Sequence, residues 1–526
     1  MSFGNKKSII KKTILGGLAA LTLLGALLAC GGGGESQKPP PATRTQPPVP
    51  RAGAAFLPGG KPYLQLGPGP QPGTLELLWM APGDQDQAWQ VATRVDGAWQ
   101  PQPAPTHVLV NLGMPSEPEH RVYRQALQGL TPGQAFSYRV QIGTEVVFES
   151  EAKALPGPGG MHRVAVVGDL VSGDLAPARR MAGMLLAKHP DLVVVPGDMV
   201  NLEGHANQYR GSLFSTWNAD PGVPASGAPL MRSIPVAGCL GNNDTDRVGE
   251  RRGPRSPMPN GLAYYYYFSM PLNGPVLRPN QGPTDDRTAL TPWLNPAAHD
   301  YAPFLRAAAG RYRKMGNYSF DSGDIHWVVL DSNLYMDFWQ DAAAQAWLRQ
   351  DLAASTQPWK FAVFHHPVFS HHGGTRHYWE KYMRRIWPIL EAGGVSMTFS
   401  GHLHAYQRAQ PLRVRAFTGT GDGSHRHFGN DANLVEDRAF TGSDAHTRAH
   451  GIIPIITGAG GAHYHNYTAP APGRPTAMGL QPTRFIQQRL SYSYLEVNAN
   501  KVEFRQIGED PATGQPVELD HFTLTR

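Results

Sequence analysis

Two stretches of the sequence decide the fold class, Val164-Ala165-Val166-Val167-Gly168-Asp169 and Leu192-Val193-Val194-Val195-Pro196-Gly197-Asp198. In each, a short continuous apolar run ends in Gly-Asp. Runs of this length and composition are typical of strands that are buried on both faces. Similar runs follow at residues 327–330, 361–364 and 397–399, and helical patterns lie near residues 177–188, 340–354 and 377–392. This alternation predicts an α/β domain in which helices cover a layered β-sheet core.

Short polar signatures close these apolar runs. In open α/β sheets, functional sites lie at the carboxyl ends of the strands, so we expect the side chains of the signatures to meet there. The signatures read, in chain order, Gly168-Asp169, Gly197-Asp198, Gly241-Asn242-Asn243-Asp244, His365-His366-Pro367 and Gly401-His402-Leu403-His404.

The residue types in these signatures indicate a metal centre. Two carboxylates, one amide and three imidazoles are the ligands that two adjacent divalent or trivalent cations require. Burying Asp169 and Asp198 at equivalent strand ends is costly unless they share a positive charge. His402 and His404 stand at alternate positions of an extended segment, so both imidazoles can face one cluster. The set predicts metal-assisted hydrolysis of phosphoesters.

The chain before this domain has a different pattern. Short strands separated by turns are expected at residues 75–79, 89–95 and 135–141, and their regular spacing predicts a β-sandwich. The turn at residues 127–133, followed by the strand around Tyr138, resembles the edge turn of a fibronectin type III domain. No residue of this module points to chemistry.

The N-terminus is typical of a bacterial secretory signal. Four lysines precede an apolar stretch at residues 14–29 that is too short to span a bilayer comfortably. The stretch ends in Leu27-Leu28-Ala29-Cys30, which resembles a lipoprotein box. Cleavage before Cys30 and its acylation would tether an exported chain to a membrane of the cell envelope, on its periplasmic or outer side. The alternative is ordinary secretion with an incidental cysteine.

The charge of the chain follows largely from this leader. Losing its four lysines lowers the formal net charge from +6 to +2. No basic stripe for binding nucleic acid is evident, and no nucleic-acid partner is expected. Cys239 is the only cysteine after Cys30, so an intrachain disulfide is not expected, and we assign Cys239 a packing role.

As a set, the signatures resemble the calcineurin-like metallophosphoesterases, and within them the purple acid phosphatase branch, which places a fibronectin-like sandwich before its catalytic domain. The resemblance covers roughly Pro62 to the C-terminus. Further matching segments are Pro62-Tyr63-Leu64-Gln65, Tyr266-Tyr267-Phe268-Ser269, Tyr318-Ser319-Phe320-Asp321, Gln345-Ala346-Trp347-Leu348, Gly401-His402-Leu403-His404-Ala405-Tyr406-Gln407-Arg408 and Gly458-Ala459-Gly460-Gly461.

The N-terminal pattern and this resemblance together predict a domain organisation. A signal peptide at 1–29 would precede a lipidated flexible linker at 30–60, a fibronectin III-like sandwich at 61–157 and a metallophosphoesterase domain at 160–526. Insertions rich in Pro and Gly lie at about 203–230, 249–312 and 413–450. These insertions either form walls or lids over the site or are ordinary surface elaboration.

The resemblance also implies a role for each candidate residue. Asp198 would bridge two metal ions drawn from Fe, Zn, Mn or Mg. Asp169 and His404 would bind one ion, and a bound water with its pKa lowered to near neutrality would attack phosphorus. The other ion would be held by Asn242, His365 and His402. His371 or His372 would contact phosphate or protonate the leaving group; the alternative for both is a solvated loop.

Two positions depart from the family pattern. Asn201 stands where the purple branch has the tyrosine that binds ferric iron, so the first metal site lacks a strong ligand unless the Asn201 amide or water fills the gap. This departure favours weaker metal binding at the first site, and Mn, Zn, Mg or ferrous iron in place of ferric iron. Asn243 stands where the family usually has a histidine, and an amide donates a hydrogen bond but delivers no proton near neutral pH.

Three hypotheses of function follow. The leading one is an exported, acid phosphatase-like enzyme that hydrolyses phosphate monoesters through a metal-activated water. The second is a phosphodiesterase acting on nucleotides or lipid headgroups, which the loss of a proton donor at Asn243 favours. The third is a non-catalytic surface-binding protein with a decayed phosphatase domain; the retained ligand set argues against it.

Overall fold

The computed structural model describes residues 55–83, 87–114, 117–201, 204–222, 226–245, 262–275, 296–333, 336, 341–370, 382–418, 431–464 and 482–526. The described residues belong to one compact unit, Pro47–Arg526. The predicted leader, residues 30–54 of the predicted linker with Cys30, and the histidines His371 and His372 lie outside the described residues. Residues 55–60 of that linker are described, and Leu57 among them is buried in the main core. In the described part of the chain, no helix is long and apolar enough to cross a membrane.

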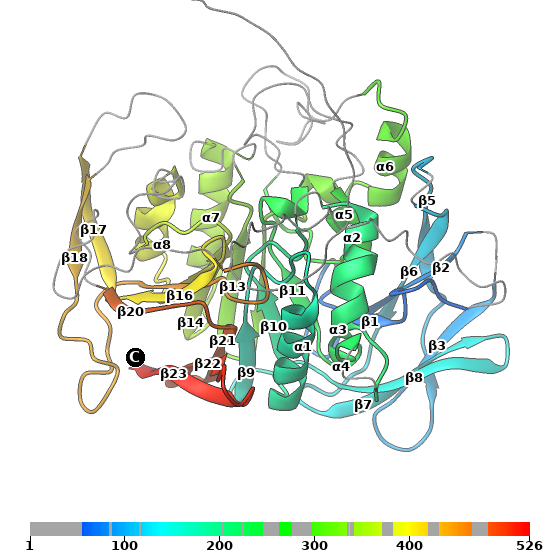
Figure 1. Ribbon diagram of the computed structural model, residues 1–526, viewed down its shortest axis with the longest axis horizontal. Coiled ribbons are helices and arrows are strands. Elements are labelled where there is room, and N and C mark those ends of the chain that lie inside the picture. Colours follow the sequence, from blue (N-terminus) through cyan, green and yellow to red (C-terminus); the bar gives the residue numbers. More distant parts are fainter. Residues whose placement is uncertain are drawn as a thin grey trace, which may run out of the picture. The chain divides into compact units, whose positions relative to one another are not determined.

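The N-terminal region forms two antiparallel four-stranded sheets, drawn in blue and cyan in Figure 1. Their inward side chains, including Trp79, Trp89 and Tyr123, form an apolar cluster of their own. This confirms the predicted sandwich. One sheet has the order β1 (Tyr63–Gln65), β2 (Leu75–Pro82), β6 (His120–Leu127), β5 (Thr106–Val110), and the other β4 (Gln100–Pro101), β3 (Trp89–Arg94), β7 (Ala135–Ile142), β8 (Glu145–Lys153).

The strands of the following α/β region are divided between two mixed sheets. The six-stranded sheet has the order β11 (Val236–Gly238), β10 (Leu192–Val195), β9 (His162–Val166), β21 (Ser491–Asn498), β22 (Lys501–Glu509), β23 (Pro516–Thr525). The seven-stranded sheet has the order β12 (Tyr318–Ser322), β13 (Ile325–Leu330), β14 (Trp359–Phe364), β15 (Met397–Ser400), β19 (Ile453–Thr457), β16 (Ala405–Ala409), β20 (Pro482–Gln487). A separate hairpin pairs β17 (Leu412–Thr418) with β18 (Asp431–Glu436).

Within each large sheet, the strands that the sequence predicted run parallel to one another. β9 and β10 are parallel, as are β13, β14 and β15. β11, which the sequence did not predict, is parallel to β10, so the carboxyl ends of these strands lie at one edge of each sheet. The two sheets share one apolar core and are joined by backbone hydrogen bonds such as Gly168 N–H to the Thr457 carbonyl, 2.9 Å. The layered β-sheet core is therefore confirmed, and its two parallel edges meet.

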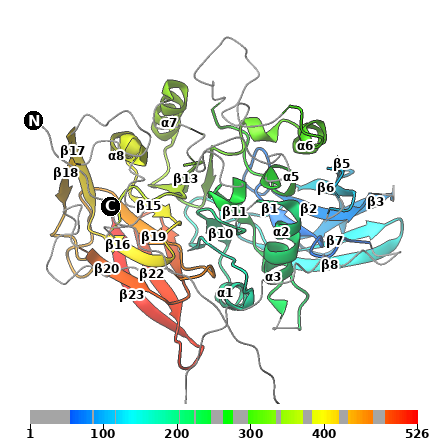
Figure 2. The ribbon, with the colours of Figure 1, turned by 45° about the horizontal axis from the view of Figure 1, so that its top comes forward.

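Helices flank this core. Figures 1 and 2 show α1 to α4 on the side of the six-stranded sheet and α7 and α8 on the side of the seven-stranded sheet. The helix predicted at 377–392 is shorter: residues 382–386 form a 3₁₀ turn, and the residues before 382 are not described. The helices are α1 (Ala176–Lys188), α2 (Ala206–Gln208), α3 (Ser215–Trp217), α4 (Leu230–Ser233), α5 (Tyr264–Tyr267), α6 (Tyr301–Ala308), α7 (Ala342–Ala354) and α8 (Trp387–Ala392), with the π-helical turn η1 (Tyr209–Phe214) between α2 and α3.

Candidate metal centre

The polar signatures meet where the parallel edges of the two sheets come together. Asp169, Asp198 and Asn242 follow β9, β10 and β11 of one sheet, and His365 and His402 follow β14 and β15 of the other. All five side chains are buried. His404, two residues beyond His402, is slightly more exposed, with 14% of its side chain accessible. Residues separated by more than 200 positions are thus brought into one cluster.

The backbone at three of these positions is strained. Asp169, Asp198 and His402 have φ values of 57°, 53° and 69°, in the left-handed region that residues other than glycine rarely occupy. Each directly follows a glycine at a strand end, where the chain turns sharply. Such a conformation costs on the order of 1 kcal/mol or more and persists where the surroundings impose it, commonly at functional sites.

Glycines let the two halves of the cluster approach closely. A Cβ atom on Gly401 would lie 2.5 Å from Oδ2 of Asp169, and one on Gly241 would lie 2.2 Å from Oδ1 of Asp198. Both distances are shorter than van der Waals contact, so any side chain there would displace a carboxylate. The glycines of the signatures are therefore required by packing around the candidate ligands.

Four donor atoms converge in the half of the cluster formed by Asp198, Asn242, His365 and His402. Oδ1 of Asn242 lies 2.9 Å from Nε2 of His365 and 3.0 Å from Nδ1 of His402. These two nitrogens lie 3.2 Å apart, and Oδ2 of Asp198 is 3.4 Å from Nε2 of His365. Ligands at 2.0–2.1 Å around a tetrahedral cation are separated by about 3.3 Å. These separations fit a cation held by Asn242, His365 and His402, with Asp198 approaching it from the His365 side.

Asp169 and His404 form the other half. Nδ1 of His404 hydrogen-bonds the carbonyl of His463, while Nε2 points at Oδ1 of Asp169 from 3.3 Å. Oδ2 of Asp169 accepts the backbone N–H of His402 at 2.8 Å. If Nδ1 carries the proton of a neutral imidazole, the lone pair of Nε2 faces a carboxylate, and a cation near both would relieve the repulsion. This pair also fits a metal.

Asp198 and His365 shift each other's pKa. Burial alone lowers the pKa of His365, but the charge of Asp198 and a hydrogen bond to it outweigh burial and raise the pKa to about 10. Burial raises the pKa of Asp198, but the attraction of His365 outweighs it, so the pKa falls well below its usual range. Asp198 and His365 thus favour each other's charged forms, and a cation held between them would supply the positive charge that Asp198 needs.

Of the remaining predicted site residues, the structure describes Asn243 and Asn201 but not His371 and His372. Asn243 donates its backbone N–H (2.8 Å) to Oδ1 of Asp198 and its amide N–H to Oδ2, so it holds the predicted bridging carboxylate. Asn201 is partly exposed, and within the described residues no hydrogen bond links its side chain to the cluster. The positions of His371 and His372 are not described, so their roles stay predictions.

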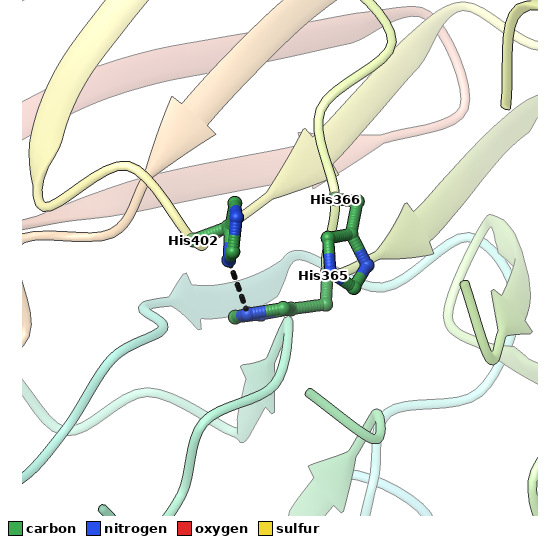
Figure 3. A group of neighbouring side chains, drawn as sticks. All are labelled: His365, His366 and His402. Atoms are coloured by element: carbon green, nitrogen blue, oxygen red, sulfur yellow. Dashed lines mark hydrogen bonds between the residues drawn. The ribbon is translucent and has the colours of Figure 1, made fainter. Parts of the chain in front are cut away.

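Three residues near the cluster had no role in the sequence analysis. Asp244 and His366 belong to the quoted signatures, but nothing in their spacing separates them from ordinary loop residues. Ser332 follows β13 and hydrogen-bonds His366. His366 lies beside the candidate ligands, since the donor atoms of His365, His366 and His402 all lie within 4.8 Å of one another (Figure 3). Its signal in the sequence was its place next to His365.

Comparison with known proteins identifies this domain. Residues 162–406 match the family model of the calcineurin-like phosphoesterases. The chain is 26% identical to Purple acid phosphatase 23 of Arabidopsis thaliana over 57% of each protein, and 32% identical to Purple acid phosphatase 18 of the same plant over 18% of this chain and 22% of that one. The chain thus matches little more than half the length of the first relative.

Two solved structures share the fold. Purple acid phosphatase PPD1 from seeds of yellow lupin (Lupinus luteus) aligns with 88% of this chain and 74% of its own, with a TM-score of 0.58 and 15% identity. PhoD aligns with 91% of this chain and 92% of its own, with a TM-score of 0.53 and 13% identity. The family match of residues 162–406, with the purple acid phosphatase relatives, confirms the resemblance of this domain to the calcineurin-like metallophosphoesterases, and the two structures agree with its fold.

Proposed function

We propose that the protein is a metal-dependent phosphoesterase that hydrolyses phosphate monoesters. The observation that carries this proposal is the convergence of Asp198, Asn242, His365 and His402, with donor separations of 2.9–3.4 Å that fit a cation. Asp169 and His404 would hold a second cation, with Asp198 between the two. Cations bound there would supply a nucleophile near neutral pH and neutralise charge on the phosphoryl group.

The chain's own residues fix the geometry for this reaction. Asn243 holds both oxygens of Asp198, so the carboxylate is oriented before substrate binds. The carbonyl of Pro196 lies 2.9 Å from Nδ1 of His365 and fixes this ring with Nε2 toward the candidate cation. Burial of the cluster excludes bulk water, which strengthens its electrostatic interactions with a phosphoryl group.

A second candidate function is hydrolysis of phosphodiesters on nucleotides or lipid headgroups. Asn243 favours it, because an amide hydrogen-bonded to Asp198 is a poor source of a proton for a leaving alkoxide. Loss of a general acid costs about 10²–10⁴-fold in rate, least for substrates with good leaving groups. The non-catalytic alternative is weakened because the candidate ligands Asp198, Asn242, His365 and His402 lie together in the cluster.

We also propose that the protein is exported and lipid-anchored through Cys30 on the outer side of a bacterial membrane. The support lies in the sequence, where lysines precede an apolar stretch that ends in Leu27-Leu28-Ala29-Cys30. Radiolabelled palmitate should be incorporated into the wild-type chain in a bacterial host, and Cys30→Ser should abolish labelling. Equal labelling of both chains would contradict the anchor.

A direct test of the enzymatic proposal uses the full chain with Cys30→Ser. Bound metals are counted by mass spectrometry, and a nitrophenyl monoester is compared with the bis-ester across pH. Asp198→Asn and His402→Ala should each lose metal and lower kcat/KM by at least 10³-fold, because each removes a donor from the cluster. Equal rates in wild type and both variants would end the enzymatic proposal, and a preference for the bis-ester would favour the diesterase.

A further inference from the structure

His366 is a third imidazole in the half of the candidate metal centre that contains His365 and His402. Its ring centroid lies 4.5 Å from that of His402 and 5.0 Å from that of His365, and the side chain is buried. Figure 3 shows the three rings together, with His366 to the side of the His365–His402 pair. The four converging donors described above do not include His366. Its contacts with Ser332 and with the two neighbouring rings indicate a role other than closing that set.

Ser332 controls the orientation of the His366 ring. The Ser332 hydroxyl oxygen accepts the backbone N–H of His366 at 2.9 Å and lies 2.9 Å from Nδ1 of the same residue. Since the oxygen already accepts the amide proton, its own proton can point to Nδ1. A neutral imidazole that accepts at Nδ1 carries its proton on Nε2, so Nε2 becomes a hydrogen-bond donor.

The loop that presents Ser332 is itself tied to the metal centre. Oδ1 of Asp331 accepts from the backbone and side-chain N–H groups of Asn333, at 2.9 and 2.8 Å. The Asn333 amide also donates to the Gly241 carbonyl at 3.2 Å, directly before Asn242. The segment Asp331-Ser332-Asn333 thus spans from the Asn242 turn to His366, and its burial keeps Ser332 in place.

We propose that His366, oriented by Ser332, donates a hydrogen bond from Nε2 to a phosphoryl oxygen of the bound ester and of the inorganic phosphate product. This inference rests on the proposed function. An oxygen of a phosphoryl group bound at the His365–His402 side of the cluster lies within reach of the His366 ring, because the three rings are neighbours. A preoriented neutral donor stabilises charge on the phosphoryl group without a change in protonation. His366 is thereby a substrate-contacting residue, and Ser332 is a positioning residue.

Matched variants test which nitrogen of His366 acts. The amide nitrogen of Gln approximates the place of Nε2, whereas that of Asn approximates the place of Nδ1. In the Cys30→Ser chain, His366→Ala should weaken binding of inorganic phosphate about tenfold by calorimetry, the effect of losing one hydrogen bond to a charged group. His366→Gln should restore most of that affinity, and His366→Asn should not. Ser332→Ala should weaken phosphate binding several-fold. His326→Gln, a buried histidine distant in the chain, serves as the control and should leave phosphate binding unchanged.

Metal content and activity separate the possible outcomes. His366→Ala should keep the wild-type number of ions per chain while kcat/KM for the nitrophenyl monoester falls at least tenfold. Loss of an ion from this variant would make His366 a ligand and overturn the inference, as would unchanged phosphate affinity in folded His366→Ala. If His366→Ala does not fold, equal phosphate affinity in the Gln and Asn variants would overturn it. Absence of metal-dependent hydrolysis in the wild type would instead reject the proposed function, and phosphate binding would still decide the role of His366.

Discussion

Asp244 joins the two turns that carry Asp198 and Asn242. Its Oδ1 accepts from the backbone N–H groups of Met199 (3.0 Å) and Val200 (3.3 Å) and from the Tyr209 hydroxyl (2.9 Å). Its Oδ2 accepts the N–H of Gly241 at 2.8 Å. A fully buried carboxyl group with four donors fixes the backbone on both sides of the cluster.

We predict that Asp244→Asn lowers both stability and metal affinity. An amide has one oxygen in place of two, so at least one donor is left without its acceptor, and one amide N–H meets another N–H. Each unsatisfied buried group costs about 1–3 kcal/mol. Tyr209→Phe is the milder partner, because it removes a single donor and should cost about 1 kcal/mol. Urea unfolding and metal titration would measure both, and an Asp244→Asn protein as stable as Tyr209→Phe would contradict the bracing role.

Asn201 stands where the resemblance to the purple branch places a metal-binding tyrosine. It is partly exposed and carries no phenolate, so we predict that the iron-loaded protein lacks a tyrosinate charge-transfer band. Absorption spectra would measure this, and a visible band in the wild type would count against it.

We also predict that chelation removes one ion per chain more readily than the other, since Asp169 and His404 provide fewer ligands than the opposite half. Metal analysis during dialysis would measure the loss of each ion, and simultaneous loss of both ions would contradict the prediction.

Among the elements, His326 connects β12, β13 and α7. It lies on β13, with Nδ1 2.6 Å from Asp321 on β12 and Nε2 2.9 Å from Asp351 on α7. Burial lowers the pKa of His326, but hydrogen bonds and charge from the two carboxylates outweigh burial and raise it to about 9. An imidazolium between two carboxylates therefore holds α7 against the sheet.

This ion triad predicts a pH dependence of stability. A histidine with a folded pKa near 9 and an unfolded pKa near 6.5 stabilises the fold fully below pH 6.5, and this stabilisation is lost as the pH rises through 9. The loss should be about 2–3 kcal/mol, with the half-exposed Asp321 keeping it at the lower end. Wild type should thus lose stability between pH 6.5 and 9.5 in urea titrations, whereas His326→Gln should show a flatter profile. Parallel profiles would contradict this.

The elements also show how much the sequence could reveal. Apolar runs precede Asp169, Asp198 and His365 in the sequence. These runs predict the strands and the sheet edge at which the three side chains lie, because a strand buried on two faces has a continuous apolar sequence. Division of these strands between two sheets carries no local signature, since it depends on β21 and β19, which pair with β9 and β15 from far along the chain. The contact of Ser332 with His366 is likewise tertiary, so the sequence does not predict it.

At the scale of the whole molecule, the sandwich and the α/β region are bonded through their interiors. Glu117, which precedes β6 of the sandwich, pairs with Arg210 of η1 at 2.8 Å, and both side chains are 2% exposed. The hydroxyl of Tyr63 donates to the Tyr267 carbonyl at 2.6 Å, and that of Tyr138 to the Arg232 carbonyl at 2.8 Å. Apolar side chains of the sandwich, including Tyr63, also belong to the main core of the α/β region.

These contacts predict that Pro47–Arg526 unfolds as one cooperative unit. A buried charge that loses its partner costs about 3–5 kcal/mol, so Glu117→Gln should lower the stability of the sandwich and of the α/β region together. Differential scanning calorimetry of the wild type should show one transition, with the calorimetric enthalpy equal to the van't Hoff enthalpy. In Glu117→Gln this single transition should move to lower temperature. Exposed Glu145→Gln on β8 is the matched control, and its melting temperature should not change. Two resolved transitions, or a Glu117→Gln shift confined to one of them, would show that the sandwich and the α/β region fold independently despite the shared core.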